Sequence, residues 1–183
     1  MRILAHLASI AFAVAVAGPA WAFELSSPDV ANGGTVPDKQ VFNSFGCKGG
    51  NVSPALVWKD SPVDAKSFAI TVYDPDAPTG SGWWHWVMFN IPSAIHELKP
   101  NAGDPKAKLA PKGAVQSMTD FGKTGYGGPC PPQGDKPHRY IFTVFALKVD
   151  KLPLDAKASG AMVGFYLNMN SVGKASFETT YGR

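Results

Sequence analysis

Three segments of this sequence have the composition and alternation of β-strands, and long loops separate them. They are rich in β-branched and aromatic residues and cover residues 68–73, 84–91 and 140–149. The connections are polar stretches punctuated by glycine and proline, without a helical pattern. Neighbouring parallel strands need long crossover connections, which are usually helical. The arrangement therefore argues against β–α–β units and predicts antiparallel pairing.

Weaker patterns complete the expected fold. Further strands are predicted at residues 55–58, 114–117 and 176–181, and the apolar residues of 157–170, which lack β alternation, indicate a helix. Hydrophobic residues make up 45% of the chain, which is enough for a core. We predict a mainly β fold, an antiparallel β-sandwich or large twisted sheet with one or two short helices near the C-terminus.

The first 22 residues have the three-part pattern of a secretory signal. Arg2 gives a positive start, an apolar stretch follows, and Ala20, Trp21 and Ala22 fit the small-x-small pattern of signal peptidase. A membrane anchor is the alternative, but the apolar run is shorter than the ~20 residues of a spanning helix. We expect a cleaved signal peptide at 1–22, a single domain at 23–183, and a periplasmic or secreted protein.

The net charge limits the kinds of partner to be expected, and the cysteine content predicts a disulfide. The formal net charge is +3 and the basic residues do not cluster, so a nucleic-acid partner is not expected. An exported chain with two cysteines most often pairs them. This predicts a disulfide between Cys47 and Cys130, with two free buried thiols as the alternative. The sequence has no phosphate-binding glycine loop, zinc-protease motif or nucleophile elbow.

Three titratable residues stand at the ends of the predicted strands. Asp74 follows the first strand, His85 lies near the start of the second, and His138 stands two residues before the third. If the first two strands pair antiparallel and the third runs parallel to the second, all three side chains meet at one rim of the sheet. Prolines in the adjoining loops restrict φ and make stiff walls. The arrangement indicates a small ligand site.

The chemistry of these side chains suits a small anion. Imidazole N–H groups donate to anions, and a carboxylate beside a histidine favours its protonated form. Asp74 is placed to act in this way on His85 or His138. An apolar rim is expected from the aromatic residues Trp83, Trp84, Trp86 and Tyr126. The alternative is that the histidines are structural and the aromatic residues belong to the core.

Longer motifs around these residues resemble the phosphatidylethanolamine-binding protein family. They read DPDAP at 74–78, WHW at 84–86, NIP at 90–92, GPCPPxG at 128–134 and HRY at 138–140. The stretch GGNVSPALxW at 49–58 is similar to a block of the bacterial, Raf-kinase-inhibitor-like branch. The resemblance implies a large central antiparallel sheet packed on a smaller one, with peripheral helices and an anion pocket at one end.

The resemblance also assigns residues to that pocket. The motif positions implied as ligand-binding are Asp74, His85, His138, Pro78, Trp83, Pro131 and Tyr140. Pro78 is also a candidate for a preceding cis peptide bond, because such bonds are almost confined to proline. Arg139 is expected to pair with Asp74 or Asp76 rather than to bind the ligand.

These observations predict an exported, non-catalytic binding protein for phosphate, phosphorylated or carboxylate ligands, with no cofactor and no metal. A protein-interaction or inhibitor-type regulator with an unidentified protein partner is the first alternative, and the resemblance also raises a homodimer. A metal-dependent or acid–base hydrolase is a weaker alternative. Stable membrane insertion is not expected, because no later segment of the sequence is long and apolar enough to span a bilayer.

Overall fold

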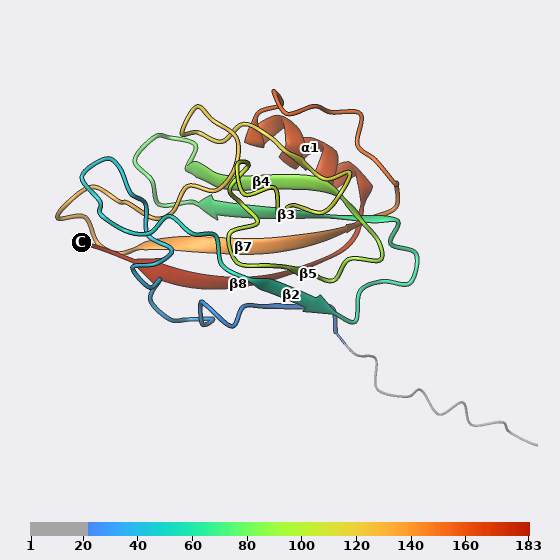
Figure 1. Ribbon diagram of the computed structural model, residues 1–183, viewed down its shortest axis with the longest axis horizontal. Coiled ribbons are helices and arrows are strands. Elements are labelled where there is room, and N and C mark those ends of the chain that lie inside the picture. The colour runs from blue at the N-terminus through green and yellow to red at the C-terminus, as the bar shows by residue number, and fades with distance from the viewer. Residues whose placement is uncertain (1–21) are drawn as a thin grey trace, which may run out of the picture.

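The computed structural model describes residues 22–183, which form two antiparallel sheets and one helix (Figure 1). The larger sheet has the order β6-β4-β3-β7-β8, with bounds Val115–Gln116, Trp83–Pro92, Ser67–Asp74, His138–Leu147 and Ser171–Tyr181. The smaller sheet has the order β1-β2-β5, with bounds Glu24–Ser26, Leu56–Lys59 and Glu97–Leu98. Helix α1 spans Gly160–Asn170. Apart from Ala22, the expected signal peptide lies outside the described residues.

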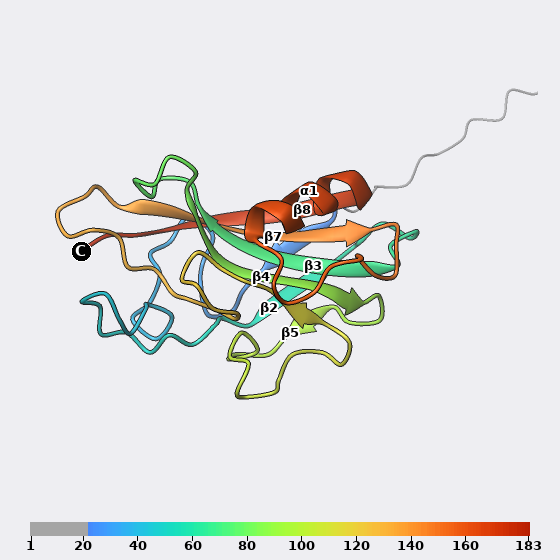
Figure 2. The same cartoon turned by 90° about the horizontal axis from the view of Figure 1, so that it is seen from above.

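The large sheet is buried on both faces. Along β3, Phe68, Ile70 and Val72 belong to the core shared with the small sheet, whereas Ala69 belongs to a second core with Leu167 of α1. Successive side chains of a strand point to opposite faces, which explains this alternation. Figure 2 shows the resulting layers, with α1 on one side of the large sheet and β2 and β5 on the other.

The structure confirms the mainly β architecture and the two antiparallel sheets. Strands β3, β4 and β8 cover their predicted segments, whereas β2, β6 and β7 overlap theirs with ends shifted by one or two residues. Strands β1 and β5 were not predicted, because three and two residues carry too little alternation to be recognised. None of the helices among residues 22–183 is long and apolar enough to cross a membrane.

The predicted helix forms, but it starts later than expected. Ser159 caps its N-terminus, and its side-chain oxygen accepts a hydrogen bond from the backbone N–H of Met162 at 3.2 Å. The helix therefore begins at Gly160 rather than at residue 157. Within the described part of the chain there is one helix, so the second short helix that the sequence left open does not form there.

Trp84 packs against α1 instead of standing at the rim of a pocket. The backbone of Gly160 comes so close to the Trp84 ring that an added Cβ would overlap it. At Gly164, one turn later, an added Cβ would lie 3.6 Å from the same ring, an ordinary contact. The prediction that Trp84 contributes to the rim is therefore wrong, since the close approach of the helix covers it.

The direction of the strands decides where the polar residues meet. β3 pairs antiparallel with both β4 and β7, so these two strands run the same way on its two sides. The register places Asp74 opposite Trp83 of β4 and Tyr73 opposite Ile141 of β7. The end of β3 thus lies beside the beginnings of β4 and β7, as the one-rim hypothesis required.

Candidate functional site

A cavity of about 200 Å³ lies at this edge of the large sheet. All seven residues that the sequence proposed as ligand-binding line it: Asp74, Pro78, Trp83, His85, Pro131, His138 and Tyr140. Phe45, Phe121 and Cys130 line it as well. Sequence reasoning missed Phe45 and Phe121, because both stand in irregular loops without strand periodicity and come to the cavity only through the fold.

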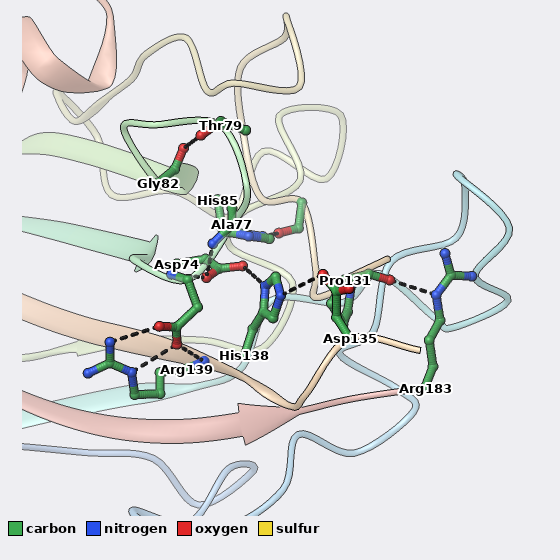
Figure 3. A network of polar contacts seen from close by, with 12 residues as sticks. Asp74, Ala77, Thr79, Gly82, His85, Pro131, Asp135, His138, Arg139 and Arg183 are labelled. Carbon is green, nitrogen blue, oxygen red and sulfur yellow. Dashed lines mark hydrogen bonds and ion pairs between the residues drawn. The ribbon is translucent and has the colours of Figure 1, made fainter. Parts of the chain in front are cut away.

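Asp74 organises the site through both of its carboxylate oxygens. Oδ1 accepts hydrogen bonds from the backbone N–H groups of Asp76 at 2.8 Å and Ala77 at 3.0 Å, which is the geometry of an Asx turn. Oδ2 accepts from Nδ1 of His138 at 2.8 Å (Figure 3). The buried carboxylate therefore shapes the loop after β3 and orients one histidine, with both oxygens already occupied.

His138 lies between two carboxylates. Its Nδ1 carries the hydrogen donated to Asp74, and its Nε2 is 3.5 Å from Oδ2 of Asp135. The ring itself is buried, whereas the Asp135 side chain is partly exposed. The structure thus answers which histidine Asp74 serves. Asp135 was missed, although its position three residues before His138 in the same stiff loop was a usable signal.

His85 has a different environment. Its Nδ1 lies 2.7 Å from the carbonyl oxygen of Gly127, which can only accept, so this nitrogen carries the hydrogen. Burial lowers the pKa of His85 to about 4, although the Gly127 carbonyl and the charge of Asp74 favour the protonated ring. At neutral pH the ring is uncharged and offers Nε2 as an acceptor. Of the two histidines that Asp74 was expected to serve, this one is not kept protonated by it, because burial outweighs the carboxylate.

Tyr140 brings a hydrogen-bond donor to the cavity. Its ring meets that of His85 edge-on, with centroids 5.1 Å apart. Its hydroxyl is buried and has no hydrogen-bond partner among residues 22–183. Burial and the negative charge of Asp74 raise the pKa of Tyr140, so the hydroxyl keeps its hydrogen. A buried polar group without a partner is uncommon and suggests that something else satisfies it.

The remaining walls are apolar. Phe121 packs edge-on against both Trp83 and His85, with centroid distances of 5.4 and 5.2 Å. Two other aromatic residues expected at the rim lie in the core instead. Nε1 of Trp86 donates to Gln116 at 2.8 Å, and the hydroxyl of Tyr126 donates to the backbone carbonyl of Gln40 at 3.0 Å. Of the four aromatic residues proposed for the rim, only Trp83 lines the cavity.

A disulfide and an arginine hold two of the loops that form the mouth. Cys47 and Cys130 are bonded, with their Cα atoms 6.0 Å apart, so the predicted pairing is present in the structure. Arg183 donates to the backbone carbonyls of Pro131 at 2.7 Å and Phe45 at 3.3 Å. It therefore ties together the same two loops as the disulfide.

A second ion pair supports the loop after β3. Arg139 contacts Asp76 through Nε at 2.8 Å and Nη2 at 2.9 Å, which settles the pairing that the sequence left open. This guanidinium lowers the pKa of Asp76 to about 2. All peptide bonds in the described residues are trans, so the candidate cis bond before Pro78 is not formed. Residues 22–183 contain no group of three or more side chains suited to hold a metal ion.

Comparison with known proteins gives close relatives. The family model described as phosphatidylethanolamine-binding protein matches residues 26–182. YbcL of Escherichia coli is 51% identical over 160 residues, which cover 87% of each chain. YbhB of the same organism is 48% identical over 158 residues, which cover 86% of this chain and 99% of YbhB. LppC of Mycobacterium tuberculosis, named as a lipoprotein, is 34% identical over 86% of this chain and 71% of its own.

A solved structure shares the fold. The crystal structure of E. coli YbcL, described as a new member of the mammalian PEBP family, matches with a TM-score of 0.86 and 50% sequence identity. The match covers 88% of this chain and 98% of that one. The arrangement of a large and a small sheet is therefore the same in the two proteins.

Proposed function

The chain belongs to the phosphatidylethanolamine-binding protein family, and from that premise we propose that it is an exported binding protein whose cavity takes a small organic acid without turning it over. The ligand carries a phosphate, phosphate-ester or carboxylate group. The observation that carries the proposal is the buried, unpartnered hydroxyl of Tyr140 beside His85 in the lining of the cavity. A ligand oxygen is the partner that this hydroxyl lacks.

The size of the cavity limits the ligand. Its volume of about 200 Å³ is below the ~300–1,000 Å³ of pockets that hold drug-sized molecules. The space suits a head group or a small acid rather than a whole two-chain lipid. Its aromatic and proline walls favour an apolar substituent next to the acid group.

The binding site can be tested by removing one oxygen atom. In isothermal titration with phosphoethanolamine, we expect Tyr140→Phe to weaken binding roughly tenfold or more, because a hydrogen bond to a charged group contributes about 1.5–3 kcal/mol. Tyr126→Phe is the matched control. That buried hydroxyl already has a protein partner outside the cavity, so its loss leaves binding unchanged. Equal affinities of Tyr140→Phe and wild type would contradict the site.

The absence of turnover is proposed from the state of the lining groups. The Thr79 hydroxyl donates to the carbonyl of Gly82, and the sulfur of Cys130 is in a disulfide. The raised pKa of Tyr140 keeps that hydroxyl a poor nucleophile. We expect no phosphate release when the protein is incubated with phenyl phosphate. Release above background that disappears in His85→Gln would instead show a hydrolase.

Export is supported by two features that agree with the predicted signal peptide. The disulfide is the kind of bond that persists in oxidising compartments. A relative named as a lipoprotein points to the cell envelope for that protein, and we extend this location to the present chain. Fractionation of cells followed by N-terminal sequencing should recover a mature protein that begins at Phe23 in the periplasm or the medium. A cytosolic chain that keeps its N-terminus would contradict this.

We propose a second copy of this chain as the protein partner. Met162, Phe165 and Met169 are exposed along one side of α1, and the helix has no charged residue that would oppose packing against another copy. We expect sedimentation analysis to show a dimer in the wild type and a monomer in Phe165→Lys. A monomeric wild type would remove this proposal.

A further inference from the structure

The cavity offers an acid ligand no fixed positive charge. Among the described residues that line it there is no lysine or arginine. The nearby guanidinium of Arg139 is occupied by Asp76, and that of Arg183 by two backbone carbonyls. Any charge on His138 is shared with the carboxylates of Asp74 and Asp135. A fully ionised ligand would therefore enter a buried site whose lining has no lysine or arginine to balance it.

The two groups left for the ligand are one acceptor and one donor. Nδ1 of His85 is held by the Gly127 carbonyl, which leaves Nε2 as the ring nitrogen that can meet a ligand in the cavity. The hydroxyl of Tyr140, which has no partner among residues 22–183, keeps its hydrogen. An acid group satisfies both when an oxygen accepts from Tyr140 and an acid hydrogen is donated to Nε2. A fully ionised group can accept but cannot donate.

The charges that face His85 also favour an added proton. Asp74 comes from β3, and Asp120 lies in the loop after β6, where its carboxylate accepts from the backbone N–H of Trp84 at 2.7 Å. The other titratable groups at the cavity are His138 and Tyr140 of β7, together with Asp135, which lies beside His138. These carboxylates would repel a ligand dianion, whereas a proton between the ligand and His85 reduces that repulsion.

We propose that the cavity takes its acid ligand together with one proton, which is shared between Nε2 of His85 and a ligand oxygen. This inference rests on the proposed function and names the protonation state in which the ligand binds. No covalent bond forms or breaks. A phosphate monoester that arrives as a dianion takes one proton from solvent, and one that arrives as a monoanion brings its own. In both cases the bound pair holds the same number of protons.

Two esters of the same shape separate this proposal from simple anion binding. Phenyl phosphate has a proton that it can bring below its second pKa of about 6. Phenyl sulfate stays fully ionised, so its binding must protonate His85 itself, whose pKa is about 4. At pH 7 the sulfate should bind about 100-fold more weakly than the phosphate, because each pH unit above the relevant pKa weakens binding about tenfold.

The experiment is isothermal titration of the wild-type protein with both esters from pH 5 to pH 8.5, in two buffers with different ionisation enthalpies. With phenyl phosphate we expect uptake of about one proton per ligand at pH 8 and an affinity that falls about tenfold per pH unit above pH 7. With phenyl sulfate we expect a tenfold gain per pH unit toward pH 5. In His85→Gln, which lacks this ring, the sulfate affinity should lose the tenfold gain per pH unit that the wild type shows.

Each outcome bears on one of the two claims. Equal affinities of the esters at pH 7 without proton uptake would overturn the shared proton and leave the acid-binding function intact. Binding of neither ester at any pH would overturn both. The proton count comes from the wild type alone, so the test stands even if His85→Gln fails to fold.

Discussion

At the scale of single residues, the two histidines of the site show how far burial decides chemistry. His138 meets the carboxylate of Asp74 at 2.8 Å, whereas His85 meets a backbone carbonyl inside an aromatic wall. The same side chain at the same rim is thus hydrogen-bonded to a buried carboxylate in one case. In the other it is a neutral acceptor, because no direct carboxylate contact compensates the loss of water.

The neutral state of His85 makes stability depend on pH. The unfolded chain binds a proton on this histidine near its ordinary pKa of about 6.5, and the folded chain only near pH 4. The contribution of this group to the free energy of unfolding is therefore fully present above pH 6.5. It is lost as the pH falls to 4, and the loss amounts to as much as about 3 kcal/mol. Urea unfolding at pH 7 and pH 4.5 measures this loss. His85→Gln should lose clearly less than wild type over that interval, and an equal loss in the two proteins would contradict the buried neutral ring.

The two aspartates after β3 should differ in their effect on stability. Asp74→Asn removes a carboxylate that accepts from Nδ1 of buried His138 and from two backbone N–H groups, so we expect a loss of about 1–3 kcal/mol in the free energy of unfolding. Asp76→Asn loses part of a pair whose arginine is half exposed, for which we expect about 1 kcal/mol or less. Urea unfolding at pH 7 compares them. Similar losses would show that Asp74 is not the organiser of this loop.

At the scale of elements, the close contact of α1 with the large sheet depends on Gly160 and not on Gly164. The buried residues Val163 and Leu167 of the helix join the core on that face of the sheet. The flat ring of Trp84 fits against the helix only where side chains are missing. Close packing of this kind tolerates added volume at one position and not at another.

Alanine at these two glycines should act in opposite directions. Gly160→Ala drives a methyl group into the Trp84 ring, and we expect a loss of about 1–3 kcal/mol. Gly164→Ala adds the same methyl at ordinary contact distance inside the helix, and we expect a gain of up to about 1 kcal/mol from the better helix former. Thermal unfolding of the two variants checks the pair. Equal effects would mean that α1 does not sit on Trp84 as described.

At the scale of the whole molecule, long-range links close the cavity. The disulfide joins residues 83 positions apart, and Arg183 ties the same loops. Phe45, in the loop on one side of the bond, lines the cavity together with Cys130 on the other. Stability and the shape of the mouth are therefore linked through one bond.

Removal of that bond should affect both properties. For a loop of this length the chain-entropy model gives about 4–5 kcal/mol, and removal of native disulfides typically costs about 2–5 kcal/mol. We expect the double variant Cys47→Ala/Cys130→Ala to lose stability in this range and to bind phosphoethanolamine more weakly. Wild type treated with a dithiol reductant should show the same losses of stability and affinity as the double variant. The double variant itself should not respond to the reductant. An unchanged affinity would show that the mouth does not depend on the disulfide.

Much of the fold could be predicted from local sequence. The residues of β3, β4 and β7 alternate or are apolar throughout, and this periodicity is visible in a single segment. The helix that ends at Asn170 and the stiff, proline-rich loops could also be predicted from their own local residues. Asp74, His85 and His138 could be placed at one rim, since strand ends and strand direction were enough to do so.

Only the tertiary structure decided which side chains of the site contact one another and whether His85 is charged. Contacts between distant segments decide three features of the site. Asp74 pairs with His138, Phe45 and Phe121 line the cavity, and Trp84 packs against α1. The neutral state of His85 follows from burial, which no local pattern reports. The sequence determines which segments form strands, because side chains of a strand alternate between its two faces and leave a two-residue pattern in the sequence. The pKa of a side chain depends on every neighbour that the fold brings near, so only the folded molecule sets it.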